Sequence, residues 1–130
     1  GNNVMNFQPL TELATKAYES KKAVPHASFY FGSLATTPTC CAIGAWYVEK
    51  YGLEKVYEAR KGKYDNLLCG IQEEVAKLCE VDDREVCAFE TGFSDGLRNN
   101  NKFAQLFEDR QQAYEEGKKF GQSCREYLET

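Results

Sequence analysis

A pattern of small residues that occurs twice near the end of the chain constrains the fold more than any other feature of the sequence. The pattern is A-[FY]-E-x-G-x-x-x-G, and it covers residues 88–96 and again residues 113–121. In a helix, residues four apart lie on one face, so each copy forms a ridge without bulky side chains. The residues of the two ridges are Ala88, Gly92, Gly96, Ala113, Gly117 and Gly121.

The glycines of these ridges require a compensating interaction, because glycine inside a helix costs about 0.8–1.0 kcal/mol relative to alanine. Close approach of two helix backbones would provide one, through dispersion contacts and Cα–H···O contacts. We therefore predict that a helix over 82–97 and a helix over 102–128 pack ridge to ridge as a tight antiparallel hairpin. A second interpretation is that the glycines leave room for a ligand or for the backbone of a partner.

Both copies of the pattern also contain a glutamate, and these two residues point away from the ridges. At about 100° per residue, Glu90 and Glu115 lie about 160–200° from the small-residue face of their helices. The pattern predicts that both side chains face solvent. It therefore gives no support to a catalytic pair of carboxylates.

Apolar residues recur with a helical period through the rest of the chain. The spacing predicts amphipathic helices over 9–22, 53–62 and 65–79, and Asp82 and Glu85 suit a capping box at the start of the helix over 82–97. Thr37-Pro38 is a helix start signal and Gly52 a stop signal. Between them, residues 40–48 are apolar or small on nearly every side. This helix is predicted to lie in the middle of the domain.

These elements predict an all-α fold, a compact bundle of about five or six helices with one buried central helix and a C-terminal helical hairpin held by glycine ridges. The chain has 130 residues, 42% of them apolar, which suits a single helical domain over residues 1–130. Residues 27–34 are expected to be irregular, because no second strand could pair with them. The longest apolar run is far shorter than the roughly 20 residues of a membrane helix, so no membrane association is expected.

Cys40 and Cys41 are the candidates for a reactive group. If Pro38 is the first residue of the central helix, Cys40 is the third, where unpaired N–H groups and the helix dipole lower the pKa of a thiol. Such a thiolate could act as a nucleophile or as a redox sensor. A Cys–His pair would have to use His26, the single histidine of the chain. The apolar residues around both cysteines favour burial instead, which raises the pKa of a thiol.

The remaining cysteine chemistry is left open by the sequence. The six cysteines suit small buried hydrophobes in a reduced protein, or structural disulfides whose pairing the sequence does not determine. No C-x2-C or H-x3-H spacing occurs, so neither a metal site nor a cofactor is expected. If the thiols are reduced, a cytoplasmic location is expected. An extracytoplasmic location stays open, because Gly1 resembles the remnant of an expression tag and a leader could have been removed.

No catalytic constellation accompanies these features. We therefore expect a small non-catalytic helical protein that acts by association, through self-assembly or through binding or inhibition of a macromolecular partner. The alternatives are a thiol-dependent enzyme or redox protein that uses Cys40 or Cys41, and an extracytoplasmic, disulfide-stabilised domain of the immunity or inhibitor type. The net charge of −4 argues against binding to nucleic acid, so the expected partner is a protein or a second copy of the chain.

Overall fold

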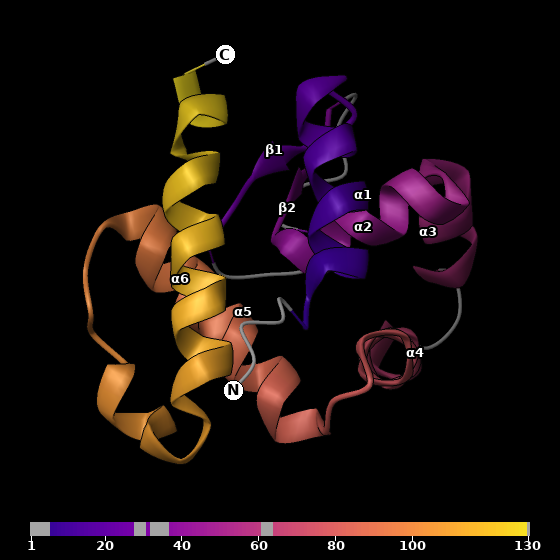
Figure 1. The fold of residues 1–130 in the computed structure, drawn as a ribbon. Helices are drawn as coiled ribbons and strands as arrows, with labels where there is room; N and C mark the ends of the chain where they lie inside the picture. The colour runs from indigo at the N-terminus through magenta and orange to yellow at the C-terminus, as the bar shows by residue number, and fades with distance from the viewer. Residues whose placement is uncertain (1–5, 28–30, 32–36, 61–63, 130) are drawn as a thin grey trace.

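The computed structural model describes residues 6–27, 31, 37–60 and 64–129 of the chain (Figure 1). Within these residues the protein is helical apart from loops and one pair of two-residue strands, so the predicted all-α bundle of about six helices is confirmed. In chain order the elements are α1 (Gln8–Glu19), β1 (Val24–Pro25), β2 (Thr39–Cys40), α2 (Ala42–Tyr51), α3 (Leu53–Arg60), α4 (Tyr64–Cys79), α5 (Asp83–Arg98), the 3₁₀ helix η1 (Ala104–Arg110), α6 (Gln111–Cys124) and the 3₁₀ helix η2 (Arg125–Glu129).

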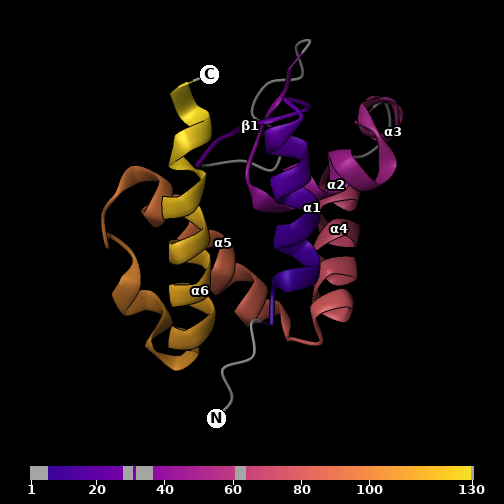
Figure 2. The same ribbon diagram turned by 45° about the horizontal axis from the view of Figure 1, so that its top comes forward.

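Helix α2 is the buried central helix that the apolar run predicts. Every residue from Ala42 to Val48 is buried, α1 packs along this helix, and α4 contacts both α1 and α2 (Figure 2). The helix ends at Gly52, whose φ of 88° lies in the left-handed region that favours glycine. The buried apolar side chains of the described helices form one connected core around α2.

The start of α2 differs from the prediction. Strand β2 pairs in parallel with β1, so that Cys40 lies opposite Pro25, and the backbone N–H of His26 donates to the carbonyl of Cys40 at 3.0 Å. Because these contacts hold the segment extended, α2 begins only at Ala42, with Cys41 as its N-cap. The prediction that Cys40 is the third residue of a helix was wrong, since a local start signal cannot reveal a distant strand partner. Most of the stretch 27–34 lies outside the described residues.

The glycine ridges of α5 and α6 lie directly against the backbone of the opposite helix. A Cβ added to Gly92 would lie 2.0 Å from the carbonyl oxygen of Tyr114, and one added to Gly117 would lie 2.0 Å from that of Phe89. The other two glycines of the ridges are as close, at 2.1 and 2.2 Å from carbonyl oxygens of the facing helix. No residue with a side chain fits at these positions unless the helices separate.

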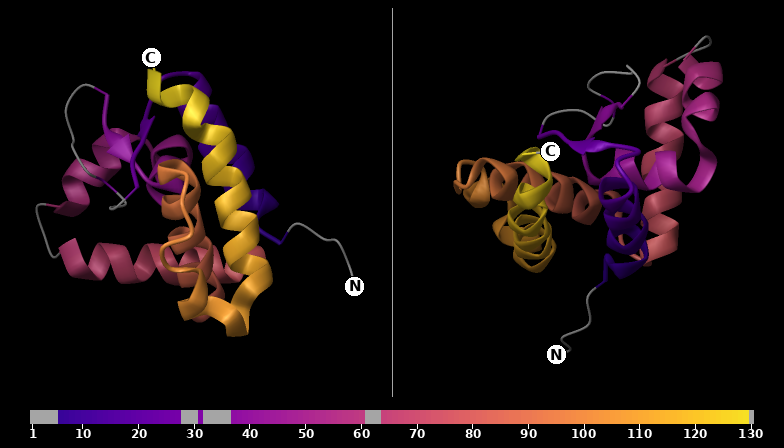
Figure 3. Two further views of the ribbon diagram at one scale, coloured as in Figure 1. Left: turned by 90° about the vertical axis from the view of Figure 1, so that its left-hand side faces the viewer. Right: turned by 90° about the horizontal axis from the view of Figure 1, so that it is seen from above.

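The direction of α6 differs from the prediction. Gly92 meets Tyr114 while Gly117 meets Phe89, and farther along both helices Gly96 meets Lys118. Residue numbers therefore rise together along the contact, so α5 and α6 run in the same general sense. The contact of Gly92 with Tyr114 corresponds to the contact of Gly117 with Phe89, with α5 and α6 in exchanged roles. The two copies of the repeat are therefore related by a local pseudo-two-fold symmetry. The predicted antiparallel hairpin was wrong in its direction, because the connection over 99–110 returns to the start of α5 before α6 begins (Figure 3).

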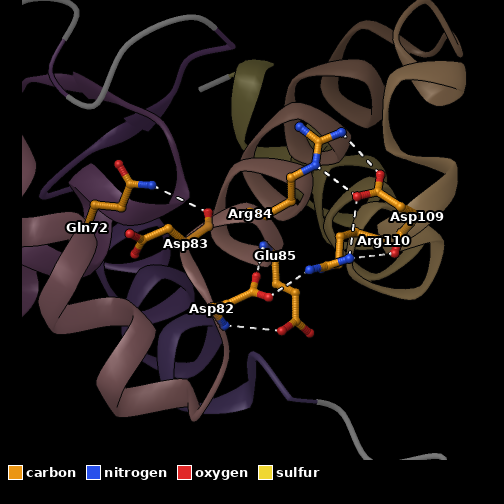
Figure 4. Close-up of polar contacts among 7 residues, drawn as sticks. All are labelled: Gln72, Asp82, Asp83, Arg84, Glu85, Asp109 and Arg110. Carbon is orange, nitrogen blue, oxygen red and sulfur yellow. Dashed lines mark hydrogen bonds and ion pairs between the residues drawn. The ribbon is translucent and has the colours of Figure 1, made fainter.

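Salt bridges hold this returning connection against the start of α5 (Figure 4). Arg84 pairs with Asp109 at 3.0 Å, and Arg110 pairs with Asp82 at 2.8 Å. Asp82 also forms the predicted capping box with Glu85, which is confirmed. The predicted continuous helix over 102–128 was wrong, since its first part forms η1 and α6 follows only after these ion pairs.

Candidate functional site

A crevice of about 320 Å³ runs along α5 near the start of α2. It contains one of the two thiols singled out by the sequence together with a carboxyl group, two hydroxyl groups and a guanidinium group. The hydroxyl of Ser94 donates to the carbonyl of Ala27 and so joins α5 to the segment that follows β1. The described residues that line the crevice are Ala27, Cys41, Glu90, Thr91, Ser94, Arg98 and Phe103.

Glu90 connects α5 to the first turn of α2. Its side chain is half-buried, and its carboxyl group interacts with the backbone N–H of Ile43 and with the thiol of Cys41, both of which lower its pKa. Its Oε1 atom is fully buried and has no hydrogen-bond partner among the described residues. Burial raises the pKa of Glu90 to about 7, and the two interactions offset only part of that effect.

The prediction that Glu90 faces solvent was therefore wrong in part, since its side chain is half-buried and its Oε1 atom is enclosed, whereas Glu115 is exposed as predicted. The helical projection places both residues away from their ridges, which is correct. It does not show that α2 covers the outer side of α5 at this point, while the corresponding side of α6 is open to solvent.

The two candidate thiols are buried and protonated. Burial raises the pKa of Cys40 to about 12. The pKa of Cys41 is also raised well above its usual value, by burial first and then by the negative charge of Glu90. Since only a thiolate is a strong nucleophile, neither group is activated in this arrangement. The expected lowering of the Cys40 pKa by a helix N-terminus does not occur, because Cys40 lies in β2.

The structure brings His26 close to Cys40 along the backbone, through the strand pairing described above. His26 lines a second depression of about 320 Å³ beside the first, together with Arg98 and Leu128. The sequence predicted no such neighbourhood, since the two residues are far apart in the chain. The signal that could have found it is the dipeptide Val24-Pro25, because the residue before a proline favours an extended backbone.

The six small residues of the ridges lie in the contact between α5 and α6. Ala88 and Ala113 are buried with the four glycines, at the ends of the ridges where the two helices meet. The contact leaves no space for a ligand at the glycines, since each faces backbone atoms of the other helix. These residues therefore serve to pack the two helices together. The packing fixes the position of α5, which contributes most of the residues that line the crevice.

A buried carboxylate that the sequence did not single out stabilises the same pair of helices. Asp95 is fully buried, and its Oδ2 atom accepts hydrogen bonds from the hydroxyl of Tyr114 at 2.6 Å and from the backbone N–H of Phe103 at 2.9 Å. Burial and the hydrogen bond to Asp95 raise the pKa of Tyr114. The local sequence around Asp95 gives no sign that this residue is buried, because its hydrogen-bond partners belong to α6 and to the connection over 99–110.

The chemistry that these groups allow is limited. Among the described residues, no group of three or more His, Cys, Asp or Glu side chains is placed to hold a metal ion. Glu90 could exchange a proton near neutral pH, but a general base needs an oxygen within hydrogen-bond reach of its substrate, and Oε1 is buried. The arrangement is that of a polar contact between helices, with an open crevice beside it.

Within the part of the chain that the structure describes, no helix has both the length and the apolar character needed to cross a lipid bilayer. Comparison of the chain with protein-family models, with curated protein sequences and with solved structures finds no significant match.

Proposed function

We propose that this protein is a non-catalytic helical protein that acts by association, either with a second copy of itself or with another protein. The observation that carries the proposal is a partly exposed aromatic cluster at the end of α2. Tyr51 is 40% exposed, and its ring lies 4.7 Å from the ring of Tyr47 and 6.2 Å from that of Trp46. We call these three rings, with Lys50 and Glu74, the Tyr51 cluster.

The polar members of the Tyr51 cluster hold the exposed ring in place. The hydroxyl of Tyr51 donates to Glu74, and Lys50 forms an ion pair with the same carboxylate at 3.0 Å. The Lys50 ammonium also lies 5.1 Å from the ring centre of Trp46 and 5.3 Å from that of Tyr51. A tyrosine that is already ordered loses little conformational entropy on binding, and tyrosine and tryptophan are enriched at protein interfaces.

The state of the thiols supports association over the alternative of thiol-dependent catalysis. Both candidate thiols are protonated at neutral pH, as their raised pKa values require. The negative net charge of the chain favours a protein partner over a nucleic acid. A cytoplasmic location is part of the proposal, because a reducing compartment suits cysteines that are buried as free thiols.

Replacing Tyr51 with alanine is expected to weaken association about 30-fold, the effect of removing a hot-spot residue that contributes about 2 kcal/mol. Sedimentation velocity over a concentration series measures self-association, and affinity capture followed by mass spectrometry detects a different partner. Leu106→Ala is the matched control, since Leu106 is 60% exposed on η1 and lies outside the cluster. A protein that stays monomeric at every concentration and captures nothing that depends on Tyr51 would contradict the proposal.

Alkylation of the native protein tests the thiol-dependent alternative. Cys40 and Cys41 are expected to react with iodoacetamide at pH 7.5 at least about 100-fold more slowly than Cys87, because only Cys87 is exposed among the cysteines whose side chains the structure describes. Peptide mass mapping over time gives the separate rates. A rate for Cys40 or Cys41 equal to that of Cys87 would favour a reactive thiol. Intact mass after alkylation, with and without reductant, reports any disulfide in the same experiment.

A further inference from the structure

The 3₁₀ helix η1 has little apolar contact with the helices on which it lies. The structure describes all seven of its residues, and Phe107 alone is buried. The backbone of Phe107 is also non-helical, with φ −122° and ψ 34°, so that η1 is kinked where this ring enters the core. The preceding residue, Leu106, is 60% exposed. One buried ring is therefore the whole apolar contribution of η1, and polar contacts provide the rest of its attachment.

The guanidinium group of Arg84, in the first turn of α5, provides most of these polar contacts. It donates two parallel hydrogen bonds to the carboxylate of Asp109, at 3.0 and 3.1 Å, and a third to the carbonyl oxygen of Leu106 at 2.6 Å. Its central carbon also lies 4.6 Å from the ring centre of Phe107. One planar group thus holds a side chain, a carbonyl group and the buried ring of η1, which the single ammonium of a lysine cannot reproduce.

A second ion pair, between Arg110 and Asp82 at 2.8 Å, lies at the end of η1 (Figure 4). We call Arg84, Asp109, Arg110 and Asp82 the clasp. All four side chains are open to solvent, with exposed fractions between 34% and 51%. Dissolved salt screens exposed charges strongly, so the attraction within the clasp weakens as the ionic strength rises.

The start of η1 is held in a different way. The backbone N–H of Phe103 donates to the carboxylate of Asp95, which is fully buried and also accepts from the hydroxyl of Tyr114. Buried groups are screened much less than exposed ones, so this anchor resists salt. The contact between α5 and α6 is formed by backbone atoms around the ridge glycines and does not depend on the clasp.

We propose that η1 is a strap that the clasp closes on α5 and that opens locally when the ionic strength rises, while the surrounding helices stay folded. Opening moves the ring of Phe107 from the core into solvent, and the buried anchor at Phe103 keeps the strap attached. This device is independent of the proposed association through the Tyr51 cluster, because that cluster lies at the end of α2. Either proposal can therefore fail without the other.

Hydrogen exchange of the wild-type protein, followed by NMR in 0.01 M and in 1 M NaCl, tests the strap. Between these concentrations the Debye length falls from about 30 Å to about 3 Å. The Leu106 amide donates to the carbonyl of Phe103 at 3.1 Å in the closed strap. A single turn is not stable in water once it is detached, so this amide exchanges when the strap opens. We expect it to exchange about 10-fold faster at high salt, the combined effect of two exposed ion pairs.

The Ala45 amide, inside the buried helix α2, reports on the rest of the fold in the same spectra. Its exchange rate should change less than about 2-fold with salt, because no ion pair of the clasp touches α2. An unchanged rate at Leu106 would overturn the proposal. An equal acceleration at Leu106 and Ala45 would do so as well, since it would mean that salt loosens the whole protein.

Three variants identify the guanidinium group as the cause. Arg84→Met keeps the aliphatic stem and should exchange at Leu106 about 10-fold faster than the wild type even at low salt. Arg84→Lys keeps the charge without the paired donors and should lie between them. Lys22→Met is the matched control, because it removes an exposed ion pair with Glu49 elsewhere on the surface and should respond to salt as the wild type does.

The same salt response in Arg84→Met as in Lys22→Met would show that the clasp does not close the strap. If Arg84→Met does not fold, the comparison of Leu106 with Ala45 in the wild type still decides the question, because it requires no substitution.

Discussion

Replacing Gly117 with alanine is expected to lower the free energy of unfolding by about 3 kcal/mol. The new Cβ would lie 2.0 Å from the carbonyl oxygen of Phe89 and 2.7 Å from its carbonyl carbon. Both are backbone atoms inside a helix, so no side chain can rotate away to make room. The helices would have to move apart along the whole contact, and the dispersion contacts between them would be lost.

The chain supplies a matched control for this prediction in Gly70, which lies inside α4 with nothing within 4 Å of an added Cβ. Gly70→Ala should stabilise the protein by up to about 1 kcal/mol, because alanine favours the helix and meets no obstacle. Because Gly92 and Gly117 occupy equivalent positions of the repeat, Gly92→Ala should lower the free energy of unfolding as much as Gly117→Ala. Urea denaturation of the three variants measures the differences. If Gly117→Ala were as stable as Gly70→Ala, the close contact between α5 and α6 would be disproved.

Truncating Phe89 to alanine is expected to cost about 4 kcal/mol, the largest effect among the predicted substitutions. Phe89 is fully buried, and its ring stacks on that of Phe7 with centres 4.3 Å apart and lies 6.3 Å from that of Phe120. It therefore joins α5 to the start of α1 and to α6 at one point. The cavity left by its removal would weaken three elements together, and the backbone contact at Gly117 would prevent them from closing it.

Thermal and urea unfolding followed by circular dichroism would measure the loss, with Leu106→Ala as the control. Leu106 is 60% exposed, so its truncation should change the stability by less than about 0.5 kcal/mol. A Phe89→Ala protein within 1 kcal/mol of the wild type would mean that this ring does not bridge the elements as described.

The elements that could be predicted from the sequence are those whose causes are local. The capping box of Asp82 and Glu85 needs only residues within one turn, and it is present. The end of α2 at Gly52 and the burial of α2 on nearly every side also follow from short stretches of sequence. The apolar stripe of α5, from Val86 to Leu97, is buried as its spacing predicts.

The errors concern contacts between residues far apart in the chain. Cys40 was expected in a helix, but its backbone accepts a hydrogen bond from His26 and so stays extended. The helix over 102–128 was expected to be continuous and antiparallel to α5. Its first part instead returns along α5 and is fastened there by Arg84 and Asp109 (Figure 4). Helical periodicity describes which face of a helix is apolar, and it contains no information on the path of a connection.

Glu90 and Glu115 show most directly what each level of description determines. The sequence by itself determined that both occupy the same position of a repeated pattern, opposite a glycine ridge, because helix geometry depends only on residue spacing. Only the tertiary structure decided that α2 covers one of them and leaves the other in water, since burial depends on which elements happen to pack nearby. The free energy of a charge depends strongly on that choice, and burial raises the pKa of Glu90 to about 7.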